Sequence, residues 1–106
     1  MIEGMGNNVP IRENEKGGKQ SDIPYAFHLI DGPALFNMAQ VYAEGAKKYE
    51  PDNWRKIPVE EHLNHAISHI YAHLAGDTQE DHIGHAQCRM NMAKAVQIEN
   101  EGDIDD

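Results

Sequence analysis

The chain has 106 residues, a formal net charge of −9 and a hydrophobic fraction of 40%, values typical of one soluble globular domain or one protomer of an oligomer. The negative charge argues against non-specific nucleic-acid binding, which needs a basic surface, and no run approaches the roughly 18 apolar residues of a membrane helix. The sequence therefore predicts neither a nucleic-acid nor a membrane partner, and the single Cys88, with no apolar leader in residues 1–20, favours the cytoplasm.

Three regions follow one another along the chain. Residues 1–20 are rich in glycine and show little periodicity, so we expect a flexible or extended arm. Residues 21–99 carry the periodic segments and form the expected domain, and residues 100–106 form an acidic tail. We expect an all-α fold, a bundle of about three main helices. Because such a short bundle buries only a modest core, assembly as an oligomer is also expected.

The first predicted helix covers residues 34–49. Asp31, Gly32 and Pro33 are typical of a helix start, and Pro51 ends the helix because it disfavours helical geometry at Glu50. Its polar face carries Glu44 four residues before Lys48, a spacing that by default indicates a solvated ion pair. The functional alternative is that Glu44 helps to bind a metal while a lysine contacts phosphate.

Asn53 and Trp54 follow this helix. A lone tryptophan in a small chain is most often a core anchor. The alternative is that Trp54 stacks on a base while Asn53 contacts the edge of that base.

The next two predicted helices contain most of the histidines. One begins at Pro58, which is expected at its first helical position. Thr78 begins a sequence typical of a capping box, so the other is expected from about Gln79 to Glu99, antiparallel to the first across a short turn at residues 75–77. The earlier helix has an apolar stripe at Leu63, Ile67, Ile70 and Leu74, and a neighbouring histidine stripe at His62, His65, His69 and His73.

Histidines and carboxylates on facing helices are typical of a metal site inside a helical bundle. The spacing of the helices selects His65, Asp81 and His85 as candidate ligands. Mg²⁺ would favour the carboxylates, whereas imidazole ligands would favour Mn²⁺, Co²⁺, Ni²⁺ or Zn²⁺. Solvated histidines on an amphipathic helix remain the alternative interpretation.

Two runs resemble a known family. They are YAEGAKKYEPDNWR at residues 42–55 and HAISHIYAHLAGDTQEDHIGHAQCR at residues 65–89. Together they resemble the dATP/dGTP diphosphohydrolase (N-terminal-domain) family of phage type, which is similar to the MazG-like all-α nucleoside-triphosphate pyrophosphohydrolases. The resemblance implies an oligomeric helical hydrolase dependent on Mg²⁺ or Mn²⁺, with other divalent metals possible. It would cleave dATP or dGTP to the monophosphate and pyrophosphate.

The resemblance also implies a site. MazG-like enzymes carry an ExxE and an ExxD motif on two helices, and the nearest match places Glu61 and Asp77 among the ligands. The expected catalytic set is Glu61, Asp77 and Asp81. The expected metal ligands are Glu44, Glu61, His65, Asp77, Asp81 and His85, and the expected nucleotide contacts are Lys47, Lys48, Asn53, Trp54 and Arg89.

The expected partners are a purine deoxynucleoside triphosphate and a second copy of the chain, in a homodimer or homotetramer. Two other classes of function stay open. One is a non-catalytic module that binds divalent metal, and the other is a helical interaction protein with incidental histidines.

Overall fold

A computed structural model describes residues 2–105 and divides the chain after Asp31 into an N-terminal unit and a helical unit. The N-terminal unit contains a two-stranded antiparallel hairpin of β1 (Ile11–Glu13) and β2 (Lys19–Ser21), followed by a short 3-10 helix, η1 (Phe27–Leu29). The prediction of an all-α chain is therefore wrong in one respect, because a small hairpin accompanies the helices.

The side chain of Asn14 explains the loop of this hairpin. Its Oδ1 accepts hydrogen bonds from the backbone N–H groups of Lys16 and Gly18, at 2.9 and 2.8 Å. Gly17 has a φ of +84°, a backbone conformation that glycine adopts without steric cost. Both strands are exposed along their whole length, so turn chemistry rather than an apolar face defines the hairpin.

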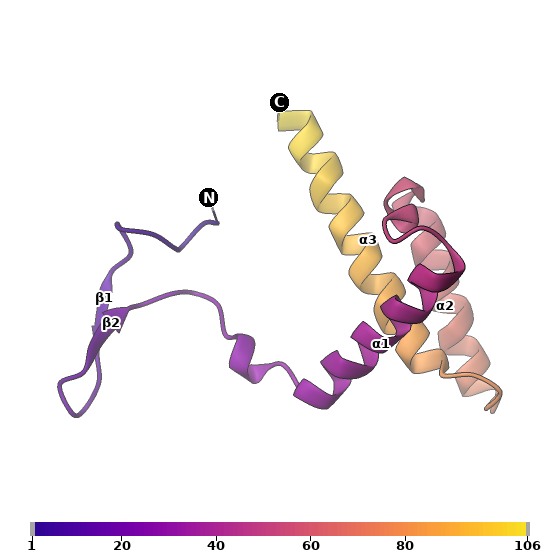
Figure 1. Ribbon diagram of the computed structural model, residues 1–106, viewed down its shortest axis with the longest axis horizontal. Helices are drawn as coiled ribbons and strands as arrows, with labels where there is room; N and C mark the ends of the chain where they lie inside the picture. Colours follow the sequence, from indigo (N-terminus) through magenta and orange to yellow (C-terminus); the bar gives the residue numbers. More distant parts are fainter. Residues whose placement is uncertain (1, 106) are drawn as a thin grey trace. The chain divides into compact units, whose positions relative to one another are not determined.

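The helical unit contains three long helices and one short one (Figure 1). They are α1 (Gly32–Lys48), the 3-10 helix η2 (Asn53–Lys56), α2 (Val59–Leu74) and α3 (His82–Asp105). The prediction of three main helices is confirmed, and α1 starts and ends close to the expected residues. Pro58 is the N-cap of α2 rather than its first helical residue. None of the helices within residues 2–105 is both long and apolar enough to cross a membrane.

The central element of the helical unit is α3, which packs against α2, α1 and η2. As the residue number rises along α3, the number of the α2 residue in contact with it falls. His82 meets His69 near one end, and Arg89 meets His62 about two turns farther along. The predicted antiparallel arrangement of these two helices is confirmed.

The start of α3 differs from the prediction. The helix begins at His82, and Asp81 caps it by accepting the backbone N–H of Gly84 at 3.0 Å. The other carboxylate oxygen of Asp81 accepts a hydrogen bond from the Asn37 side chain of α1, at 3.1 Å. The capping box at Thr78 is thus wrong, because Asp81 satisfies the first turn and residues 75–81 form a longer connection.

Gly84 lies where α3 approaches this Asp81–Asn37 pair. It is buried, and a Cβ there would lie 2.7 Å from Asn37 Oδ1 and closer still to the Asp81 carboxylate. We expect Gly84→Ala to lower the free energy of unfolding by about 1–2 kcal/mol in urea denaturation, because the cap must shift. Gly45→Ala is the control: a Cβ there meets nothing within 4 Å, so a gain of up to about 1 kcal/mol is expected. Equal effects of both changes would contradict this explanation.

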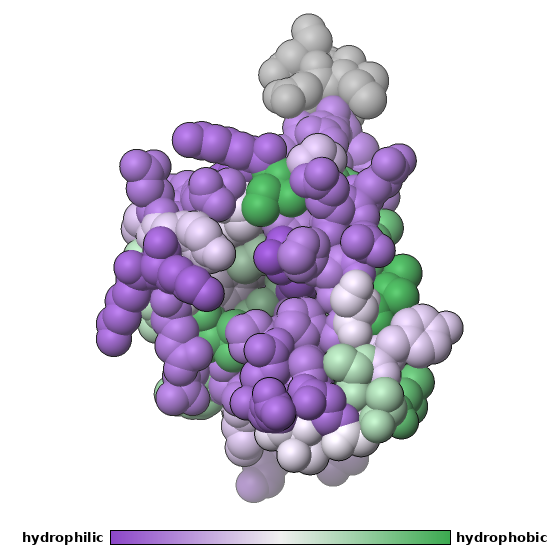
Figure 2. All heavy atoms as spheres, turned by 90° about the vertical axis from the view of Figure 1, so that its right-hand side faces the viewer, coloured by the Kyte–Doolittle hydropathy of each residue, from purple (hydrophilic) through white to green (hydrophobic). Residues whose placement is uncertain are grey.

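The core of the helical unit is small, and α2 buries an unexpected face. The buried apolar residues are Ala66, Ala86, Cys88, Ala93 and Val96, and His62 is 0% exposed. The predicted apolar stripe of α2 points largely outward, with Ile67, Ile70 and Leu74 exposed. Apolar side chains thus reach the surface among a mostly hydrophilic face (Figure 2). Instead, α2 turns small and imidazole side chains toward α3, among them Ala66 and His62.

Candidate functional site

A groove of about 640 Å³ lies in the helical unit. All of the helical elements contribute to its wall. The lining residues with polar side chains include Tyr42, Glu44, Lys48, Tyr49, Glu50, Asn53, Trp54, His65, His69, Glu80, His85 and Arg89. The groove therefore combines two cationic side chains, an indole ring and a set of imidazoles and carboxylates.

Most of the residues selected from the sequence line this groove. Those that do are Glu44, Lys48, Asn53, Trp54, His65, His85 and Arg89. Those outside its lining are Lys47, Glu61, Asp77 and Asp81. Thus the structure brings together the expected nucleotide contacts, apart from Lys47, but separates the three expected catalytic carboxylates from the groove wall.

These three carboxylates have different surroundings. Glu61 is exposed in the first turn of α2, and Asp81 caps α3. The hydrogen bond from the Gly84 N–H, and then that from Asn37, hold the pKa of the Asp81 carboxyl below its usual value. A carboxylate with a lowered pKa is a weaker base, and these hydrogen bonds make Asp81 the N-cap of α3 in this structure. Asp77 binds His82, with Oδ2 2.5 Å from Nε2.

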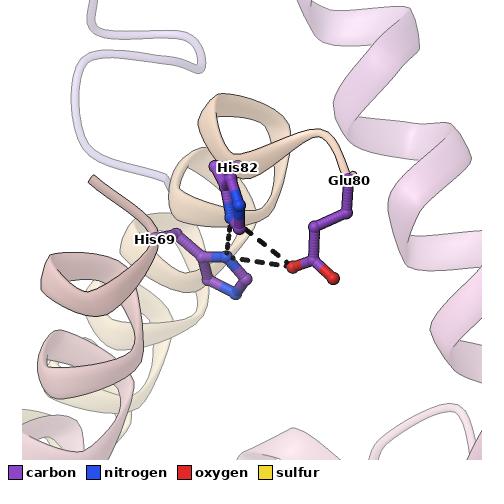
Figure 3. Close-up of side chains that lie close together, drawn as sticks. All are labelled: His69, Glu80 and His82. Atoms are coloured by element: carbon purple, nitrogen blue, oxygen red, sulfur yellow. Dashed lines mark hydrogen bonds and ion pairs between the residues drawn. The ribbon is translucent and has the colours of Figure 1, made fainter. Parts of the chain in front are cut away.

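The closest group of possible metal ligands is His69, Glu80 and His82 (Figure 3). His69 comes from α2, His82 is the first residue of α3, and Glu80 lies in the connection between the helices. The two Nδ1 atoms are 2.9 Å apart, and Glu80 Oε1 lies 3.3 Å from His69 Nδ1 and 3.5 Å from His82 Nδ1. Among the described side chains, this group can offer three ligand atoms to one ion.

The environment of His69 favours its neutral form. Burial, and then the neighbouring His85, lower the pKa of His69. The His85 ring stacks on the His69 ring with their centroids 5.1 Å apart. Neutral imidazole is the form that binds metal ions, so His69 is favoured in the protonation state that a ligand needs.

Sequence reasoning selected His65 and His85 and missed the pair His69 and His82. The signal that could have found them was Asp81. Had it been read as the N-cap, His82 would have fallen at the start of α3, opposite the last turns of α2.

Trp54 lies half-buried at the edge of the groove. Its ring meets Tyr42 and His62 edge to face, with centroids 6.2 and 6.5 Å away. The Arg55 guanidinium lies over the indole, 4.3 Å from its centroid, and pairs with Asp52 and Glu99. Trp54 is therefore a packing anchor that also presents part of its surface to the groove.

His62 connects three elements behind the groove. Its Nε2–H donates to the backbone carbonyl of Trp54 at 2.9 Å, and its Nδ1 accepts a hydrogen bond from the Arg89 guanidinium at 3.1 Å. This pattern requires a neutral ring, and burial lowers the pKa of His62. His62 therefore positions Arg89 at the groove wall.

The lowered pKa of His62 predicts loss of stability in acid. In the unfolded chain His62 takes up a proton near pH 6.5, whereas in the folded chain its lowered pKa keeps the ring neutral to lower pH. The contribution of His62 to the free energy of unfolding is therefore full above pH 6.5 and declines as the pH falls below that value. We expect the thermal midpoint of the wild type to fall between pH 7.5 and pH 5. The decline should be shallower in His62→Gln, which cannot titrate, with His69 supplying the remainder. Parallel profiles for the two proteins would contradict this assignment.

Comparison with known proteins gives one match. A family model described as "dATP/dGTP diphosphohydrolase, N-terminal" matches residues 14–106. No curated protein matches the chain significantly. No solved structure does so either.

Proposed function

Since the chain belongs to the dATP/dGTP diphosphohydrolase N-terminal family, we propose that it hydrolyses a purine deoxynucleoside triphosphate, dATP or dGTP, to the monophosphate and pyrophosphate. The observation that carries this proposal is the composition of the groove. It places two cationic side chains, an indole ring and several imidazole and carboxylate side chains along one volume of about 640 Å³. A nucleoside triphosphate needs these same three kinds of contact, for its phosphates, its base and its metal ion.

The proposed roles follow from residue chemistry. Lys48 and Arg89 would bind the triphosphate and balance the charge that develops on the pyrophosphate leaving group. The exposed part of Trp54 would contact the purine ring, and Asn53 would contact the edge of the base. Against the chain's overall charge of −9, these cations are what allows an anionic substrate to bind.

A divalent ion fits the donors present beside these groups. His69, Glu80 and His82 offer two ring nitrogens and a carboxylate oxygen to one position. The sequence resemblance implies Mg²⁺ or Mn²⁺, with other divalent metals possible, and the two imidazoles favour an ion that accepts nitrogen ligands over Mg²⁺. Such an ion would neutralise phosphate charge and activate a water molecule. Glu44 and His65 also line the groove, and we propose that one of them takes up the proton of the attacking water. Glu61, Asp77 and Asp81 stay proposed members of the catalytic set, and Asp77 would act by positioning His82.

Self-association is part of the proposal. The exposed apolar side chains of α2, among them Ile67, Ile70 and Leu74, support a homodimer or homotetramer in which this face is covered. We also propose the relation to MazG-like pyrophosphohydrolases and a phage origin of this type of enzyme, both of which rest on the sequence resemblance.

Pyrophosphate release from a panel of dNTPs and NTPs tests the proposal. With Mg²⁺ or Mn²⁺ we expect release from dATP or dGTP well above that from pyrimidine nucleotides, and loss of the signal in EDTA. Release of phosphate instead of pyrophosphate would contradict cleavage between the α- and β-phosphates. No release by folded protein with either metal would reject the hydrolase, and the histidine cluster would then favour a non-catalytic metal-binding module.

A further inference from the structure

We propose that His69, Glu80 and His82 form a binding site for a transition-metal ion of the Zn²⁺ or Co²⁺ type, which the site selects over Mg²⁺. Neither the sequence pattern nor the family match assigns this set of ligands. The proposal concerns metal binding alone, so it stands or falls independently of nucleotide hydrolysis.

The spacing of the three donor atoms is close to that of a metal site. Ligand atoms arranged tetrahedrally around an ion, at bond lengths of about 2.0–2.2 Å, lie about 3.3–3.6 Å from one another. Glu80 Oε1 lies 3.3 and 3.5 Å from the two Nδ1 atoms, and these nitrogens are 2.9 Å apart. Opening the nitrogen pair by a few tenths of an ångström would bring the three donors to ligand spacing, and Figure 3 shows them facing a common point.

The contact between His82 and Asp77 orients the His82 ring for metal binding. Asp77 Oδ2 lies 2.5 Å from His82 Nε2, so Nε2 carries the hydrogen and Nδ1 presents its lone pair to the cluster. A carboxylate behind a metal-binding histidine fixes the tautomer and the ring orientation in this way in known metal sites. His82 is only 7% exposed, so its ring is also held by packing. Asp77 is therefore a positioning residue for this site.

The donor set determines the class of ion. Two imidazole nitrogens and one carboxylate oxygen suit Zn²⁺, Co²⁺ and related ions, whereas Mg²⁺ prefers oxygen ligands in an octahedral arrangement. The carboxylates of Glu80 and Asp77 supply the negative charge that balances a divalent cation. Three protein ligands leave at least one coordination position open, and both His69 and Glu80 line the groove, so that position can face its interior.

Titration of the metal-free 106-residue chain with Co²⁺, without nucleotide, tests this site. We expect a visible ligand-field absorption that saturates at one equivalent per chain, is abolished by Zn²⁺ and persists in millimolar Mg²⁺. Competition with a chromogenic chelator then gives the Zn²⁺ affinity of each variant. Glu80→Gln should weaken Zn²⁺ binding at least 100-fold, and Asp77→Asn about 10- to 100-fold.

Two variants complete the design. His82→Asn should abolish the absorption, and circular dichroism checks that its helices remain. If His82→Asn does not fold, Glu80→Gln still tests the site, because the Glu80 side chain is more than half exposed and its replacement should leave the fold intact. His73→Asn is the matched control, because His73 is an exposed histidine of α2 outside the cluster, and it should bind Zn²⁺ as the wild type does.

Three results would overturn the proposal. One is wild-type Zn²⁺ affinity in folded Glu80→Gln, and another is loss of binding in His73→Asn. The third is displacement of Co²⁺ by millimolar Mg²⁺, which would indicate an oxygen site instead. Because no measurement here involves turnover, a protein that binds metal without hydrolysing nucleotides supports this site while contradicting the proposed function.

Discussion

Replacing His62 by alanine is expected to lower the free energy of unfolding by about 3 kcal/mol. The side chain is 0% exposed, and its removal leaves both a cavity and two unpaired partners, the Trp54 carbonyl and one N–H of Arg89. A lost buried side chain costs about 2–5 kcal/mol, and an unsatisfied buried polar group costs about 1–3 kcal/mol before relaxation or entry of water reduces the sum. Equilibrium unfolding in urea, monitored by circular dichroism at pH 7.5, measures this change.

The matched control is His73→Ala. His73 is on the same helix but exposed, so we expect a change within about 0.5 kcal/mol. His62→Gln should recover part of the loss, because an amide can both donate to Trp54 and accept from Arg89. A loss below about 1 kcal/mol in His62→Ala would mean that this histidine does not hold the three elements together.

The second large effect concerns two adjacent lysines. Lys47 and Lys48 lie side by side in the last turn of α1 and have the same charge, but only Lys48 lines the groove. We expect Lys48→Met to lower kcat/KM for the purine deoxynucleotide by about 10- to 100-fold, since a charge-assisted hydrogen bond to phosphate is worth about 1.5–3 kcal/mol. Steady-state pyrophosphate release over a range of nucleotide concentrations measures the change.

Lys47→Met provides a control with unusually close matching. It removes the same charge from the same helical turn, so effects of net charge and of the helix dipole are equal in the two variants. We expect less than about a threefold change. Similar losses in both variants would indicate general electrostatic attraction and would contradict a specific contact by Lys48.

The sequence predicted the helices better than it predicted their faces. Proline positions located the start of α1 and the break after it, and the prediction of three helices with α2 and α3 antiparallel was correct. The orientation of α2 was not predictable from hydrophobicity. Hydrophobicity favoured burial of Ile67 and Ile70, whereas the structure buries His62 and Ala66. A buried histidine becomes favourable only when both ring nitrogens find partners, and those partners are distant in sequence.

The residues of the groove were predictable only in part, because side-chain chemistry can be read from the sequence but the exact ends of the helices cannot. Lys48, Asn53, Trp54 and Arg89 were selected because their chemistry suits a nucleotide, and they do line one groove. The cluster of His69, Glu80 and His82 was missed, because it depends on the end of one helix, the start of another and the connection between them. An error of three residues in the start of α3 was enough to select different histidines.

The way α1 is attached has a consequence for motion. None of its residues is fully buried, and among the described helices it packs mainly on α3, whereas α2 and α3 enclose most of the core between them. Few buried contacts mean a low free energy of local opening, so α1 should separate from the unit more readily than α2 does. Because α1 carries Glu44 and Lys48, each such opening removes one wall of the groove. A ligand that spans the groove, in contact with α1 on one side and α3 on the other, would therefore slow this local opening.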